Sequence, residues 1–272
     1  MMKKIASFIV SLLLTAGIVH GQVSFKDYDV KCFYNLSFQP DSTDPGSKRI
    51  EAMVLLVNSK ASLFMSYNSF LYDSSAYETF KKTGSAFGDM KSAMAFKTKI
   101  RYKIVKDNEK IFAYDKINDN SFVYEEALKN SSWKIQKDTS TIDGINCQKA
   151  ILNYGGRQWI AWFAPSIPIS DGPYKFRGLP GLIINISDKK DFYKFELTSI
   201  VNSKGQYLTP EKIDYVKISK EKYFKAADEY KKNQYEMDQL GGVKFTGGQE
   251  AIKKRLQEQA AKDNNPIEFW VK

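Results

Sequence analysis

The chain has 272 residues, of which 43% are hydrophobic and 26% charged, and its net charge is +10 at neutral pH. The lysines and arginines are scattered without a long basic block, so the sequence argues against nucleic-acid binding. The one histidine, His20, lies in a segment that we expect to be removed. The mature chain then lacks the imidazole needed for Ser-His-Asp or Cys-His catalysis and for His-ligated zinc, copper or haem. We therefore expect no metal and no cofactor.

Residues 1–21 have the features of a secretory signal peptide. Lys3 and Lys4 precede an apolar run over residues 5–19, and small residues lead to a cleavage site after Gly21. A spanning helix needs about 20 apolar residues, so this run is too short, and we expect no transmembrane segment after cleavage. The mature protein is expected to be periplasmic, or secreted.

Alternation of apolar and polar side chains dominates the chain to about residue 201 and predicts a series of short strands. The expected strands cover residues 30–38, 49–58, 62–67, 100–106, 110–115, 121–125, 133–137, 146–154, 157–164, 181–187 and 192–201. Turns rich in Gly, Asn, Asp and Ser join them. This pattern predicts a mainly β (α+β) protein with a curved antiparallel sheet or a partial barrel.

A few helices are expected to pack against this sheet. One begins near Ser75, where Ser75 and Glu78 fit a capping box, and ends at Gly84. Two more close the chain over residues 219–240 and 249–261, each with one apolar stripe. We expect residues 22–240 to form a single β-rich domain. Residues 241–272 then add a C-terminal helix and tail that pack on the same domain.

The two cysteines, Cys32 and Cys147, are expected to form a disulfide bond, because the cell envelope permits disulfides. A bond that closes so long a loop would stabilise the fold by at most about 4–5 kcal/mol. Two buried thiols are the alternative. A reactive thiol is not expected, because neither cysteine has a histidine or a Cys-x-x-Cys partner to lower its pKa.

Gly155 and Gly156 lie between two alternating runs and predict a tight hairpin whose turn needs positive φ at both positions. In this register Tyr154 faces Arg157 across the hairpin. Because both faces carry aromatic side chains, we expect the hairpin to lie centrally in the sheet and to be covered on each side.

A loop with a fixed shape follows the hairpin. Residues 171–183 contain three glycines and two prolines, which restrict the backbone, and residues 178–183 form the hexapeptide Gly-Leu-Pro-Gly-Leu-Ile. The neighbouring matches are Cys147-Gln148-Lys149-Ala150, Gly156-Arg157, Ala161-Trp162, Pro165, Ile167-Pro168 and Gly172-Pro173-Tyr174-Lys175-Phe176. With these residues the chain resembles the GLPGLI family of exported Bacteroidetes proteins, densely over residues 143–186 and again at residues 265–268. The resemblance implies an exported protein of this architecture, and it implies no settled activity.

Two interpretations of the motif stay open. In the first, the motif sets a bend that returns the chain to the sheet; the bend residues are Gly178, Leu179, Pro180 and Gly181, and the hairpin glycines are structural as well. In the second, two cations and two aromatic rings converge beneath the loop and hold a carboxylate, a phosphate or a peptide terminus. These candidate ligand-binding residues are Arg157, Trp159, Tyr174 and Lys175. The cations could instead pair only with Asp171 or a carboxylate on a strand.

Three functions follow from this sequence. The first is a non-catalytic binding or carrier protein that holds an amphipathic lipid or peptide in an aromatic-lined hollow. The second is an accessory or assembly partner of an outer-membrane complex, which uses an exposed patch or a sheet edge. The third is a carboxylate-dependent hydrolase, but Asp171, Glu125 and Glu126 lack a diagnostic spacing, so no catalytic residue is assigned. Residues 41–44 fit no calcium-binding pattern and are interpreted as a turn.

Overall fold

The computed structural model describes residues 18–20, 25–84, 90–127, 132–209 and 214–269. The strands are β1 (Ile18–His20), β2 (Asp27–Phe38), β3 (Arg49–Val57), β4 (Ser62–Ser66), β5 (Lys103–Lys106), β6 (Lys110–Ile117), β7 (Asn120–Ala127), β8 (Lys134–Ile142), β9 (Ile145–Tyr154), β10 (Arg157–Ala164), β11 (Leu182–Asp188), β12 (Tyr193–Gln206) and β13 (Asp214–Lys217). The helices are α2 (Tyr67–Thr83), α3 (Met90–Ala95), α4 (Lys220–Lys232), α5 (Gln234–Leu240), α6 (Gln249–Ala261) and the short 3-10 helix η1 (Pro45–Ser47).

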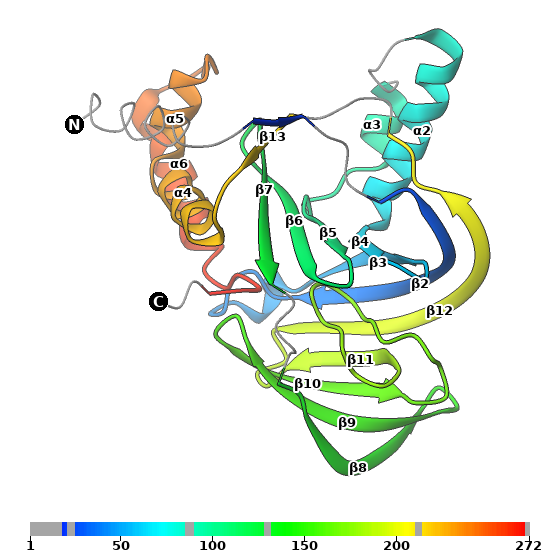
Figure 1. The fold of residues 1–272 in the computed structure, drawn as a ribbon. Helices are drawn as coiled ribbons and strands as arrows, with labels where there is room; N and C mark the ends of the chain where they lie inside the picture. The colour runs from blue at the N-terminus through cyan, green and yellow to red at the C-terminus, as the bar shows by residue number, and fades with distance from the viewer. Residues whose placement is uncertain (1–17, 21–24, 85–89, 128–131, 210–213, 270–272) are drawn as a thin grey trace.

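The described strands form one sheet of thirteen in the order β1-β13-β7-β6-β5-β4-β3-β2-β12-β11-β10-β9-β8. Each pair of neighbours is antiparallel except β13 and β7, which are parallel. The sheet curves strongly but stays open (Figure 1). The mainly β fold is therefore confirmed, as an open, mixed sheet.

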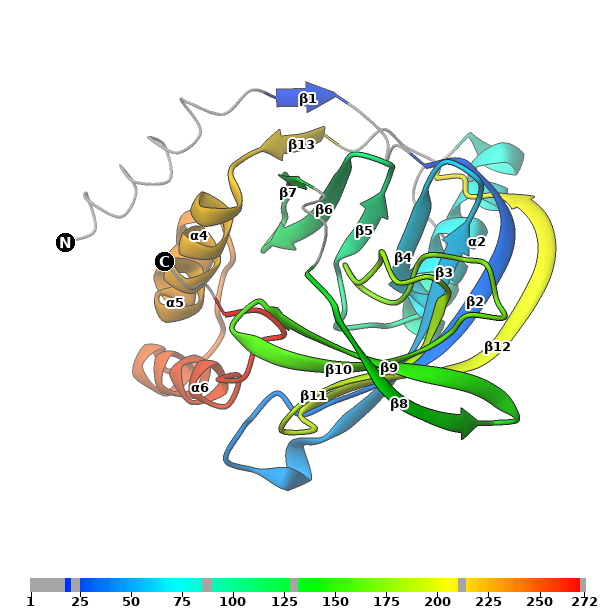
Figure 2. The ribbon, with the colours of Figure 1, turned by 60° about the horizontal axis from the view of Figure 1, so that its bottom comes forward.

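The long strands β2 and β12 bend through the middle of the sheet and connect its two ends (Figure 2). Their pairing shifts register between Leu197 and Ser199 and again between Asn202 and Gly205. Such irregularities bend a strand and increase its local twist, which accounts for the curvature here.

Each strand expected from alternation is present, and its bounds differ from the prediction by a few residues. The structure adds β13 and β1, which are too short to leave a periodic pattern. β1 lies within the segment that the sequence predicts to be cleaved, and residues 1–17 of that segment lie outside the described residues. No described helix is long and apolar enough to cross a bilayer.

Helix α2 begins eight residues before the expected start at Ser75, because β4 runs directly into it with Ser66 at the N-cap. The Ser75 hydroxyl does not cap a helix; it lies 2.8 Å from the Ser92 hydroxyl of α3. The expected end at Gly84 is confirmed, since Gly84 is the C-cap with a φ of 71°.

The expected helix over residues 219–240 is divided at Asn233 into α4 and α5, and Ser219 caps α4 by accepting a hydrogen bond from the Lys222 amide. The helix expected over residues 249–261 is confirmed as α6. Helix α4 packs on β6 and β7, whereas α6 packs on α4 and α5 (Figure 1).

The concave side of the curved sheet holds the main apolar core, and the loop after β10 contributes Tyr174, Phe176 and Leu179 to it. Side chains from distant strands join the same core; they include Tyr34, Phe64, Phe163 and Phe195. Because successive residues of a strand point to opposite faces, β3 and β4 also supply a second cluster on the other face, which α2 covers.

The hexapeptide forms a bend before β11 in which Leu179 and Gly181 are buried and Gly178 and Pro180 are exposed. Gly181 has a φ of 148°, and a Cβ atom there would lie 2.1 Å from the Ala164 carbonyl oxygen, so only glycine fits. Leu179 is buried beside it. The Lys106 ammonium, from β5, is fully buried and holds the same loop through Asp171 at 2.6 Å and the Gly172 carbonyl at 2.6 Å.

The hairpin turn has φ values of 59° at Gly155 and 74° at Gly156, and Tyr154 pairs with Arg157, so the predicted register is confirmed. The expected cover on both faces is only partly correct. Trp159 is buried, whereas Trp162 on the opposite face is partly exposed. The reason is position, because β10 and β9 lie near one end of the sheet and not at its centre.

The predicted disulfide bond is wrong. Cys32 on β2 and Cys147 on β9 are both free and buried, with β12, β11 and β10 between them. Neighbouring strands lie about 4.8 Å apart, so three intervening strands place the two cysteines much farther apart than the limit of about 7 Å between the Cα atoms of a disulfide. Burial raises the pKa of Cys32 to about 12 and also raises that of Cys147, so neither thiol is activated.

Candidate binding site

Residues 264–269, here called the C-terminal segment, leave α6 and run without regular secondary structure against the turn between β9 and β10 (Figure 2). Two polar residues of this segment are almost completely buried, Asn265 and Glu268, each 2% exposed. A charge buried to this extent is stable only with partners, so the surrounding side chains define a site built around the segment.

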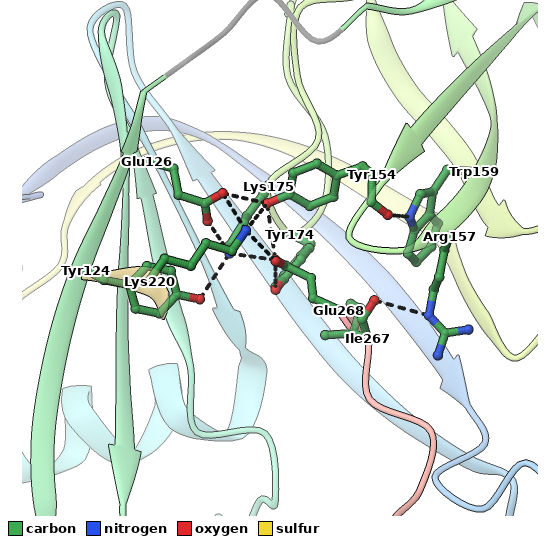
Figure 3. A network of polar contacts seen from close by, with 10 residues as sticks. All are labelled: Tyr124, Glu126, Tyr154, Arg157, Trp159, Tyr174, Lys175, Lys220, Ile267 and Glu268. Carbon is green, nitrogen blue, oxygen red and sulfur yellow. Dashed lines mark hydrogen bonds and ion pairs between the residues drawn. The ribbon is translucent and has the colours of Figure 1, made fainter. Parts of the chain in front are cut away.

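Glu268 is held by two ammonium groups and two phenols (Figure 3). Its Oε1 lies 2.6 Å from Lys175 Nζ and its Oε2 lies 2.7 Å from Lys220 Nζ. The hydroxyls of Tyr174 and Tyr154 donate to Oε1 at 2.5 and 3.2 Å. Burial alone would raise the pKa of Glu268, but the two ammonium groups outweigh it and lower the pKa to about 2.

A second carboxylate closes this arrangement. Glu126, at the end of β7, lies 2.5 Å from Lys175 Nζ and 2.7 Å from Lys220 Nζ. Each carboxylate thus contacts both lysines, and we call Glu126, Lys175, Lys220 and Glu268 the four-charge cluster (Figure 3). Lys175 is buried, but the Glu126 and Lys220 side chains are 16% and 23% exposed, so the cluster reaches the surface on their side.

Arg157 recognises the backbone of the segment. Its Nε donates to the carbonyls of Pro266 and Ile267, each at 3.2 Å, and its Nη2 donates to the Asn265 side chain. Nη1 is ion-paired with Asp188 at 2.9 Å. The planar guanidinium has several donors in a fixed fork, which suits it to adjacent carbonyl groups.

Aromatic rings complete the contacts of Arg157. Its guanidinium lies 4.8 Å from the ring centres of both Tyr193 and Phe269. The Tyr193 hydroxyl donates to the Asn265 carbonyl at 2.6 Å, so this tyrosine binds the segment by its ring and its hydroxyl. We call Arg157, Lys175, Lys220, Tyr174 and Tyr193 the clamp.

The hairpin turn also shapes the site. The Phe269 amide donates to the Gly155 carbonyl at 2.8 Å. A Cβ atom at Gly155 would lie 2.8 Å from Glu268 Cγ, so this position needs glycine for close approach as well as for its positive φ.

The other end of the segment is fixed by a turn over residues 41–44. Asn264 donates to Asp41 Oδ1 at 2.8 Å and accepts from the Ser42 amide at 2.9 Å. Asp41 Oδ1 also accepts from the Thr43 amide at 3.0 Å, so these residues form a turn, as expected. Within the described part of the chain, no group of His, Cys, Asp and Glu side chains is arranged to hold a metal ion.

Residues 154–185 match a family model described as a protein of unknown function (Porph_ging). This stretch contains the hairpin turn, β10 and the hexapeptide loop. The match fits the expected kind of family, but it is short and does not identify the GLPGLI family itself, which stays a prediction. No curated protein matches the chain.

Among solved structures, two crystal forms of a protein named PNGF-II are similar, each with a TM-score of 0.50 and 14% sequence identity. The similarity covers 76% of this chain and 34% and 33% of those chains, so this chain spans about a third of their length. At this identity the similarity shows the fold alone. An uncharacterized conserved protein from Thermus thermophilus gives a TM-score of 0.33 at 7% identity over 71% of this chain and 91% of its own, which supports no inference.

The structure brings three of the four candidate residues together around the C-terminal segment. Arg157, Tyr174 and Lys175 all contact the C-terminal segment. Trp159 does not; its indole donates to the Tyr154 carbonyl at 3.1 Å, and its ring packs 4.6 Å from Phe176 in the core. Whether the site binds a ligand from outside the chain stays a prediction.

Several residues of the site have no local sequence signal. Glu126, Lys220, Glu268 and Tyr193 come from four separate parts of the chain, and each is an ordinary polar or aromatic residue in its own segment. Glu126 was considered from sequence only as a hydrolase carboxylate. The resemblance at residues 265–268 marked the segment without showing what the segment contacts.

Two surface hollows lie elsewhere among the described residues. One, of about 930 Å³, lies beside the turn between β8 and β9 and is lined by residues such as Thr141, Gln148 and Ile167. The other, of about 390 Å³, lies beside Lys60 and Arg177. No aromatic side chain lines either hollow.

Proposed function

We propose that this chain is a non-catalytic binding protein of the cell envelope and that its ligands are peptides. One observation carries the proposal: Arg157, Tyr174 and Lys175, predicted from sequence to hold a carboxylate, a phosphate or a peptide terminus, contact the backbone carbonyls and the carboxylate of a peptide segment. In the structure that segment belongs to the chain itself. The clamp therefore has the chemistry of a peptide-binding site with a resident occupant.

A peptide fits this site better than a lipid does. The clamp offers hydrogen-bond donors and positive charge to carbonyl and carboxylate oxygens. The aromatic side chains that a lipid carrier would place around a hollow instead pack on one another, with Phe176 in contact with Trp159 and Tyr174. A packed cluster of this kind leaves its rings unavailable to an acyl chain.

Acid–base catalysis is the weaker alternative for the four-charge cluster. Hydrolysis by a carboxylate pair requires one carboxyl group whose pKa is raised, so that it can donate a proton near neutral pH. The pKa of Glu268 is instead lowered to about 2, so this group stays ionised. Its ion pairs with Lys175 and Lys220 suit Glu268 to binding and not to proton transfer.

The accessory role remains a related proposal, since a peptide ligand in the envelope would be a segment of another protein, such as a member of an outer-membrane complex. The similarity to about a third of the PNGF-II chain supports a role as a binding module, because a similar fold occurs there as one part of a longer protein. Export itself is proposed from the predicted signal peptide.

The experiment uses the full chain carrying Asn265→Ala and Glu268→Gln, which weaken the resident segment and leave the clamp unchanged. A labelled peptide with the sequence of residues 263–272 is titrated in and followed by fluorescence anisotropy. A segment tethered in the same chain competes at an effective concentration on the order of millimolar, so we expect the variant to bind the peptide at least about tenfold more tightly than the unaltered chain.

The matched control is the same peptide carrying Glu268→Gln, which should bind more weakly because it cannot pair with Lys175 and Lys220. Circular dichroism and a thermal melt establish that the variant is folded. A folded variant that binds neither peptide would overturn the proposal.

A further inference from the structure

We infer that residues 241–248 are a hinge, and that the clamp also accepts the C-terminal arm of a second copy of this chain in an exchanged dimer. The arm is α6 together with the C-terminal segment. The inference rests on the proposed function, because it uses the same peptide-binding site. It adds that one peptide bound by the clamp is the arm of a second copy.

The hinge is a glycine-rich connection between α5 and α6. Gly242 and Gly247 have φ values of 89° and 122°, which other residues rarely adopt. A Cβ atom at Gly242 or Gly248 would meet no described atom within 4 Å, and Val243 between them is 41% exposed. The packing contact that a change of direction would cost is the stacking of Phe245 on Tyr235, whose ring centres lie 4.9 Å apart; the glycines on both sides leave the backbone free to turn.

The arm is held weakly in the middle and strongly at its end. Ile252 is the buried residue of α6, the first turn has no side-chain cap, and the ion pair between Lys253 and Glu236 is partly exposed. In contrast, Asn265 and Glu268 are buried; Arg157 donates to the Asn265 side chain, which itself donates to the Gln39 carbonyl, and Glu268 is paired with Lys175. The C-terminal segment is therefore bound at the clamp like a peptide ligand, and α6 connects it to the rest of the chain.

Exchange between two copies would preserve these contacts. Each arm would meet the same clamp on the other copy, and only the hinge would change its conformation. Within one chain, a flexible tether of this length gives an effective concentration on the order of millimolar, so the closed monomer prevails in dilute solution. The length of the hinge therefore decides between closed monomer and exchanged dimer.

The first test deletes residues 241–248, which joins α5 directly to α6 and prevents the arm from folding back on its own α5. Every clamp and arm residue remains. We expect the dimer fraction at micromolar concentration to rise at least about tenfold, since closure within the chain is blocked. Light scattering coupled to size exclusion measures this fraction. A matched chain with an eight-residue Gly-Ser hinge should stay monomeric.

The second test identifies which chain supplies the arm. Light and ¹⁵N-labelled copies of the unaltered chain are unfolded together, refolded at about millimolar concentration to favour exchange, and treated with a carbodiimide, which joins a carboxylate to an amine in contact. Lys231 and Asp263, 3.0 Å apart between α4 and the arm, form a suitable pair. In exchanged dimers that contain one copy of each label, this cross-link should join the light chain to the heavy chain.

The results of these tests separate the proposed exchange from the proposed function. Mixed cross-links in the dimer fraction support exchange, even where the deleted hinge prevents folding. A dimer whose Lys231–Asp263 cross-links join only chains of the same label, or a folded hinge-deleted monomer, overturns it. Peptide binding without exchange would leave the proposed function standing, whereas failure of both experiments would remove both.

Discussion

Glu268 is a buried carboxylate whose charge is offset by Lys175 and Lys220. We predict that Glu268→Gln lowers the free energy of unfolding by about 3 kcal/mol, because breaking a buried ion pair leaves uncompensated charge. Urea denaturation measures the change. Glu196→Gln is the control, since Glu196 pairs with Lys194 at the surface and should lose less than about 0.5 kcal/mol. Equal losses in the two variants would contradict the account.

The lowered pKa of Glu268 predicts how stability depends on pH. The ordinary pKa is 4.5 and the folded value is about 2, so the ionised group stabilises the fold above pH 4.5. That stability is lost as the pH falls from about 4.5 through about 2, and its full size is on the order of 3 kcal/mol. Denaturation series at pH 7 and pH 3 on the unaltered chain and on Glu268→Gln test this. Between pH 7 and pH 3 the free energy of unfolding should fall less in the variant than in the unaltered chain. Equal decreases would refute the lowered pKa of Glu268.

Two glycines of the hexapeptide differ in what surrounds them. A Cβ atom at Gly181 would clash with the Ala164 carbonyl, whereas at Gly178 it would meet no described atom within 4 Å. We predict that Gly181→Ala lowers the free energy of unfolding by about 3 kcal/mol or more. Gly178→Ala, which is strained only by its positive φ, should cost about 1 kcal/mol. Thermal melts of both variants would reveal the order, and the reverse order would be inconsistent with this bend.

At the scale of elements, the two cysteines lie on strands that do not adjoin, so we predict two free thiols. The intact mass of the chain without reductant should equal the fully reduced mass. A thiol reagent should modify Cys32 and Cys147 only after unfolding, because both are buried. A mass lower by two hydrogens would show a disulfide bond between Cys32 and Cys147, which would contradict the separation of β2 and β9 in the structure.

Periodic elements could be predicted from the sequence, and contacts between distant elements could not. Alternation located the strands because a half-buried strand repeats every two residues, and the paired glycines fixed the β9–β10 register. The start of α2 was missed because no turn separates it from β4. The disulfide was wrong because loop-closure entropy says nothing about which strands lie between Cys32 and Cys147.

The candidate site shows the same division. Arg157, Tyr174 and Lys175 could be found because one loop and one hairpin bring them together in a short stretch of sequence. Glu126, Lys220 and Glu268 could not, because only the curvature of the whole sheet and the course of the chain after α6 place them side by side (Figure 3).

At the scale of the whole molecule, two segments tie the curved sheet together. The loop between β10 and β11 packs Tyr174, Phe176 and Leu179 into its concave side, where Lys106 of β5 holds Asp171. The C-terminal segment then joins the β9–β10 turn to β7 and α4 through the four-charge cluster. The segment therefore stabilises the fold and at the same time fills the site that we propose for peptides.

The dissociation constant of the labelled 263–272 peptide for the Asn265→Ala, Glu268→Gln chain, measured with and without Lys175→Met, tests the central claim most directly. A buried charge-assisted hydrogen bond contributes about 1.5–3 kcal/mol, so the account predicts that Lys175→Met weakens binding at least about tenfold. An unchanged dissociation constant in a folded variant would contradict the claim that the clamp is a peptide-binding site.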